Sequence, residues 1–105
     1  MTHRERTALV FKTGRFHLSG RVDFQTVPAL FKDGERQFAG HHRVTIDGSG
    51  ITHANSAALS LWLQWAELMR VSGGRMLLRS IPDSLVRLAR VSQVSELLGL
   101  EDQGG

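Results

Sequence analysis

The sequence predicts an α/β fold in which a four-stranded mixed β-sheet packs against three main helices, in the order β-β-α-β-α-β-α. Two observations predict this class: short β-rich runs alternate with segments of helical periodicity, and glycine-containing turn signals separate most of them. We expect at least two helices, those starting near Thr26 and Ser56, to pack on one face of the sheet. The 105 residues, of which 41% are apolar, fit a single domain over the whole chain.

The first two predicted strands form a hairpin. Residues 7–11 place Leu9 and Phe11 on one face, and residues 16–20 alternate apolar with polar side chains. Residues 12–15 between them have the composition of a tight turn. The chain is therefore expected to reverse direction within its first twenty residues.

The first helix follows this hairpin and is expected to stop at Gly40. Asp23 or Thr26 is suited to cap it, and Pro28 fits a first turn, where a missing N–H costs little. Asp23 is alternatively a residue at the rim of the candidate surface described below. The apolar positions roughly follow helical spacing: Val27, Leu30, Phe31 and Phe38.

A third strand over residues 44–46 is predicted to end in a turn at residues 47–50. Residues 51–52 then return briefly to β-like composition. Within the turn, Asp47 and Ser49 are expected to order the backbone through side-chain hydrogen bonds. The two residues therefore support the loop that precedes the second helix.

The remaining elements follow from composition and spacing. Residues 75–79 read as a buried strand, and the segment led by Pro82 introduces a third helix. Residues 94–100 are expected to form a short helical or irregular piece. Residues 101–105 are predicted to be a frayed C-terminus.

The second helix, predicted from Asn55 or Ser56 to about Val71, has an unusually wide apolar arc. That arc exceeds what is needed to cover one side of a sheet. Trp62 and Trp65 lie within it, and each is either a core residue or part of a contact surface, because tryptophan is frequent in both settings.

One edge of this helix is predicted to be a docking surface for a partner protein. The polar side chains of the helix gather on the side away from the apolar arc, and Leu63 projects into this polar sector. The predicted docking residues are Asn55, Ser56, Ser60, Leu63, Gln64 and Glu67. The apolar excess would also serve a homodimer in the absence of that partner.

Several chemistries find no support in the sequence. There is no cysteine, which excludes disulfides and thiolate metal sites. The neighbouring His41 and His42 would point to opposite sides of a strand, so we expect no metal and no cofactor. His53 precedes Ser56 by three residues, but no flanking motif announces an oxyanion hole, so no catalytic residue is assigned and no enzymatic activity is expected.

The charge pattern indicates neither nucleic-acid binding nor export. The formal net charge is +3. The one local excess of arginines, over residues 70–90, could meet nucleic acid, anionic lipid or an acidic protein face, but such a spread is most often a solvated surface. The charged N-terminus is followed by no apolar leader, and the apolar-rich residues 57–69 are too short and too polar to span a bilayer. We therefore expect a cytoplasmic protein.

Two stretches of the chain resemble the STAS domain family, named for sulfate transporters and anti-sigma factor antagonists. They are Leu18-Ser19-Gly20-Arg21-Val22-Asp23 and residues 46–58, in which Asp47 precedes Asn55-Ser56 at the family's spacing. The later order of Gly-Gly, strand and Pro-led helix also matches, so the resemblance covers nearly the whole chain. Within the family, the short length and the Leu18-Ser19-Gly20 motif are most similar to the STAS subunit of Mla-type phospholipid-transporting ABC complexes.

The resemblance implies a non-catalytic subunit that binds the ATPase of such a complex, with Ser56 in the contact. Its membrane contact would be only indirect, at the inner membrane and through the complex. An alternative is an anti-sigma factor antagonist, in which Ser56 is the phosphoacceptor for a kinase-type anti-sigma factor. The family's aspartate before this hydroxyl is Asn55 here, and Ala57 and Ala58 replace the small residues that follow, which favours the transporter interpretation.

Overall fold

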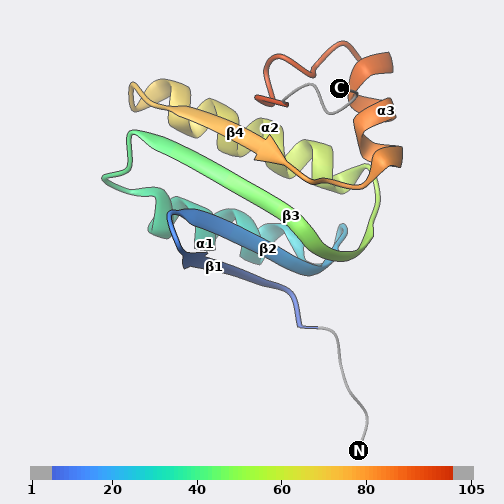
Figure 1. The fold of residues 1–105 in the computed structure, drawn as a ribbon, viewed down its shortest axis with the longest axis horizontal. Helices are drawn as coiled ribbons and strands as arrows, with labels where there is room; N and C mark the ends of the chain where they lie inside the picture. The colour runs from blue at the N-terminus through green and yellow to red at the C-terminus, as the bar shows by residue number, and fades with distance from the viewer. Residues whose placement is uncertain (1–5, 101–105) are drawn as a thin grey trace, which may run out of the picture.

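The computed structural model describes residues 6–100 and confirms the predicted α/β class and element order. The elements are β1 (Ala8–Lys12), β2 (Arg15–Val22), α1 (Val27–Phe38), β3 (Arg43–Ala54), α2 (Ala57–Val71), β4 (Arg75–Arg79) and α3 (Asp83–Val91). The sheet has the order β1-β2-β3-β4, with β1 antiparallel to β2 and the other pairs parallel. In Figure 1, α1 and α2 lie behind the sheet, and α3 lies beyond the end of β4. The frayed C-terminus predicted for residues 101–105 falls outside the described residues.

The hairpin of β1 and β2 is closed by Thr13 and Gly14. Both have a positive φ, 53° and 79°, which is the backbone conformation whose twist matches that of paired antiparallel strands. β1 is an edge strand, yet its Leu9 carbonyl accepts a hydrogen bond of 2.7 Å from the Gln37 side chain of α1. Helix α1 therefore satisfies part of this edge of the sheet.

The turn predicted at residues 47–50 is wrong, because β3 continues through it to Ala54. Residues 46–54 of β3 lie opposite the shorter residues 16–22 of β2, and the pairing shifts register twice. β3 therefore contains β-bulges, in which the longer strand bends to accommodate extra residues. The Asp47 carboxylate accepts a hydrogen bond of 2.8 Å from the Ser49 N–H at the first bulge, so the expected side-chain support exists within a strand.

Both tryptophans of α2 are core residues, with exposed fractions of 0%. The indole N–H of Trp65 donates to the Phe31 carbonyl of α1 at 3.4 Å, and its ring packs edge-on against Phe38. α2 buries its wide apolar arc against both the sheet and α1, which removes these rings from any contact surface.

Helices α1 and α2 approach closely at Gly34, a buried residue of α1. A Cβ atom built at this position would lie 2.3 Å from the Trp65 Nε1 atom, well inside van der Waals contact. The indole ring therefore occupies the space that any larger side chain at residue 34 would need, and this contact sets the distance between the two helices.

Beyond α3, residues 94–100 form an irregular, turn-rich segment that runs beside β4. Leu98 is fully buried, and the Leu78 N–H donates to the Gly99 carbonyl at 2.9 Å. Leu100 forms an isolated parallel bridge with Leu78. The segment thereby covers part of the second edge of the sheet.

Within residues 6–100, no helix combines the length and the apolar character needed to cross a bilayer.

We predict that Gly34→Ala destabilises the protein. At an unobstructed helix position this change stabilises by about 0.5–1 kcal/mol, because glycine loses more backbone entropy on folding. Here the methyl group would collide with Trp65, and overpacking of a core costs about 1–3 kcal/mol. Urea denaturation measures the sign directly, and a variant more stable than the parent would show that the helices are not packed at this distance.

Candidate docking surface at the start and edge of helix α2

The link between β3 and α2 lies at the end of the sheet where the parallel strands finish. Ala54 pairs with Val22, and the Asn55 N–H donates to the Val22 carbonyl at 3.3 Å. Ser56 follows immediately and is exposed. Because β3 extends through its bulges to Ala54, Ser56 lies beside the end of β2 and near the loop that leads to α1.

Asn55, and not Ser56, supplies the side-chain hydrogen bond at the start of α2. Its Oδ1 atom accepts the Ala57 N–H at 2.9 Å, whereas Ser56 occupies the N-cap position without a side-chain capping bond. Of the two residues at which the sequence predicts the helix to begin, only Asn55 therefore caps it through its side chain. An asparagine and an aspartate can both accept this bond, so the departure from the family pattern removes a charge and keeps an acceptor.

The loop between β2 and α1 is ordered by Asp23. Its Oδ1 atom accepts the N–H groups of Gln25 and Thr26 at 3.0 and 3.1 Å, and Arg21 forms an ion pair of 3.3 Å with it. Burial raises the pKa of Asp23, but the hydrogen bonds from the Thr26 and Gln25 N–H groups and from Arg21 outweigh it, so the pKa lies below its ordinary value. Thr26 stands at the N-cap of α1 without a side-chain capping bond.

This ordered loop presents Phe24, whose exposed fraction is 70%. It follows Val22 by two residues and therefore lies at the same end of the sheet as Ser56. Sequence reasoning missed Phe24, although an aromatic residue in the short polar segment between a strand and a helix is a signal that could have found it. Such exposed rings are frequent anchors at protein interfaces.

The predicted edge of α2 forms one surface in the structure. Ser60, Gln64 and Glu67 are exposed and Leu63 is half-buried among them. Gln64 donates to the Ser60 hydroxyl at 3.2 Å, and Glu67 accepts two bonds of 2.9 and 2.6 Å from Arg70. The Arg70 hydrogen bonds and charge lower the pKa of Glu67, which keeps its carboxylate ionised.

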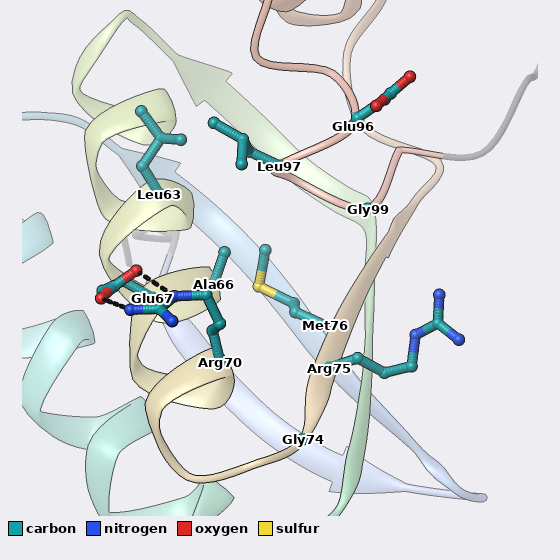
Figure 2. Close-up of a pocket in the computed structure, with 10 residues that line it drawn as sticks. All are labelled: Leu63, Ala66, Glu67, Arg70, Gly74, Arg75, Met76, Glu96, Leu97 and Gly99. Atoms are coloured by element: carbon teal, nitrogen blue, oxygen red, sulfur yellow. Dashed lines mark hydrogen bonds and ion pairs between the residues drawn. The ribbon is translucent and has the colours of Figure 1, made fainter.

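Two hollows flank Leu63 along this edge. One, of about 710 Å³, lies between α1 and α2, where Phe31 and Val71 contribute apolar walls. The other, of about 340 Å³, lies between α2, β4 and the C-terminal segment. Figure 2 shows Leu63 and Leu97 facing each other across this second hollow, with Met76 below them and the Glu67–Arg70 ion pair at its border.

The geometry suits recognition of another protein more than chemistry on a small molecule. Exposed apolar walls beside hydrogen-bonding side chains are what a protein interface combines at its centre and rim. The apolar residues Phe31, Leu97 and Val71 of the hollows were not predicted as part of this surface. Phe31 and Leu97 reach Leu63 only through tertiary packing, whereas Val71 lies about two turns farther along α2. Among residues 6–100, no three histidine, aspartate or glutamate side chains gather as a metal site would require.

The chain was also compared with known proteins. The family model described as "Mlab, STAS domain" matches residues 5–99, which is most of the 105-residue sequence. A search of curated proteins found no match. The model's span includes both bulges of β3, the Asn55-Ser56 link and all seven elements of the fold. Because the match covers far more than half of the sequence and agrees with the fold, the chain belongs to the Mlab, STAS domain family.

Proposed function

We propose that this protein is a non-catalytic interaction subunit that binds the cytoplasmic ATPase of an Mla-type phospholipid-transporting ABC complex. Its membership of the Mlab, STAS domain family supports this class of function. The observation that carries the proposal is the exposed Ser56 residue, whose side chain does not cap α2 and which continues directly into the α2 edge. The complex would hold the protein in the cytoplasm at the inner membrane.

The surface around Leu63 offers a physical basis for this docking. Apolar side chains of the ATPase would enter the two hollows beside Leu63 and gain free energy from leaving water. Gln64 and the Glu67–Arg70 pair would remain at the rim and restrict which partner fits. Ser56 and Phe24 would extend the contact to the end of the sheet.

The first experiment is co-purification of the protein with the ATPase subunit encoded beside its gene. A stable complex that survives gel filtration is the expected result. Failure to bind any such ATPase would contradict the proposal.

A second candidate function is an anti-sigma factor antagonist switched by phosphorylation of Ser56. The exposed position of Ser56 at a helix N-terminus favours it, because helix N-termini stabilise anions. We would incubate the protein with its kinase-type anti-sigma factor and ATP and measure the intact mass. One added phosphate that is lost in Ser56→Ala supports this function, and an unchanged mass contradicts it.

We predict that Asn55→Ala destabilises the protein by about 1 kcal/mol, whereas Ser56→Ala changes its stability by much less. The first substitution removes the acceptor of the Ala57 N–H, and the second removes no capping bond. Thermal denaturation of both variants measures the difference. The opposite order would mean that the Ser56 side chain supports the fold.

We also predict that Ser56→Glu folds normally but loses its partner. A carboxylate near a helix N-terminus stabilises the free protein slightly, by up to about 1 kcal/mol. In a packed interface the same charge must be desolvated without a counterion, so the affinity for the ATPase should fall by more than about a hundredfold.

The matched control for this prediction is Ser84→Glu. Ser84 is also exposed and lies in the first turn of α3, so the charge change and helical context are similar. Isothermal titration calorimetry with the purified ATPase should give parental affinity for Ser84→Glu. Equal affinities for both variants would place the docking surface away from Ser56.

A further inference from the structure

The sheet has one face covered by α1 and α2 and an opposite face that carries a concentration of basic side chains. Along each strand, buried residues alternate with outward-facing ones, as in Val44 after Arg43 and Met76 after Arg75. Figure 2 shows Arg75 and Met76 pointing to opposite sides of β4. The four strands each contribute one basic residue at the same end of the sheet, the left end in Figure 1. We call this set the basic face: Lys12, Arg15, Arg43 and Arg75.

The basic face is assembled from like charges placed directly opposite one another. Lys12 pairs in register with Arg15, and Arg43 pairs with Arg75. Opposed like charges on neighbouring strands destabilise a sheet. The two pairs together involve all four strands, and each works against folding unless an anion lies against it.

Little negative charge offsets it within the sheet. The four strands contain six arginine and lysine residues and a single carboxylate, Asp47. Asp47 lies 3.5 Å from Arg15, and the hydrogen bonds from Ser49 together with the charges of His17 and Arg15 hold its pKa below the ordinary value. It thus offsets one cation, while Lys12, Arg43 and Arg75 remain exposed.

The side chains around the basic face indicate the kind of anion. Phe11 and Phe16, the two phenylalanines in the strands, pack against each other on the side of the sheet that α1 covers. The basic face consequently lacks the aromatic platform on which single-stranded nucleic acids stack. Its cations extend across all four strands, whereas the centre of a protein interface is depleted of charge. One exposed apolar side chain, Val10, shares this face with Lys12. A broad, fluid anionic surface requires neither an aromatic platform nor a charge-depleted centre.

We propose that the basic face binds the surface of a bilayer that contains anionic phospholipids. This direct contact goes beyond the proposed function, in which the protein reaches the membrane only through its complex. A lysine or arginine near an anionic bilayer strengthens binding about fivefold, so the three cations that Asp47 does not offset suffice for a measurable attraction that salt weakens.

The basic face lies far from Ser56, but it meets the docking surface at Arg75, which also lines the second hollow beside Leu63. Arg43 opens β3 and Ser56 follows its end, and a strand of twelve residues separates the two by about 35 Å. The basic face also lies on the side of the sheet away from α2. A bilayer on the basic face would therefore leave Ser56 and the start of α2 accessible, with Arg75 at the border between the two contacts.

The test is co-sedimentation of the purified chain with phosphatidylcholine vesicles that contain phosphatidylglycerol, compared with vesicles of phosphatidylcholine alone. The parent should bind only the anionic vesicles, and less at high salt. In the double variant Lys12→Glu/Arg43→Glu, binding should fall by at least about 25-fold. Each substitution converts a like-charge pair into an opposite-charge pair, so circular dichroism should show an intact fold.

The control is Arg87→Glu/Arg90→Glu, which makes the same charge change at exposed positions of α3. It should bind anionic vesicles nearly as well as the parent. Absence of parental binding, equal loss in both double variants, or salt-sensitive binding to duplex DNA without binding to vesicles would overturn the proposal. Because the assay contains no ATPase, its result is independent of whether the proposed docking partner is correct.

Discussion

The packing of Trp65 against Gly34 is the contact on which the candidate docking surface depends. It lets α1 and α2 lie close together, and the indole hydrogen bond to the Phe31 carbonyl fixes the ring against the neighbouring helix. With both indoles buried, α2 is held in one rotation about its own axis. That rotation turns Leu63, Gln64 and Glu67 away from the core, so a core interaction determines which side chains of α2 are accessible.

The order and type of the elements could be predicted because hydrophobic periodicity is a local property of the sequence. The bulges of β3 could not, because a stretch such as Asp47-Gly48-Ser49-Gly50 has the composition of a turn and only pairing with β2 extends it into a strand. Asn55 and Ser56 are both good caps by composition. Backbone geometry alone decides that the asparagine side chain reaches the Ala57 N–H.

The candidate site likewise has one part that the sequence predicts and one part that it does not. The outward edge of α2 follows from the helical repeat of about 100° per residue, which places Ser60, Leu63, Gln64 and Glu67 on one side of the helix. The two hollows depend on how α1, β4 and the C-terminal segment pack around that edge. Phe31 and Leu97 come from segments distant in sequence, so no local pattern associates them with Leu63.

At both edge strands of the sheet, a backbone group is already hydrogen-bonded within the molecule, which limits how two copies can associate. The Gln37 side chain donates a hydrogen bond to the Leu9 carbonyl of β1, and the Gly99 carbonyl accepts one from the Leu78 N–H of β4. A strand from a second molecule would have to displace these bonds before it could lengthen the sheet, which is how natural proteins resist amyloid-like stacking. Any symmetric pairing of two copies would therefore have to use side-chain surfaces such as the hollows beside Leu63, where it would compete with the proposed partner.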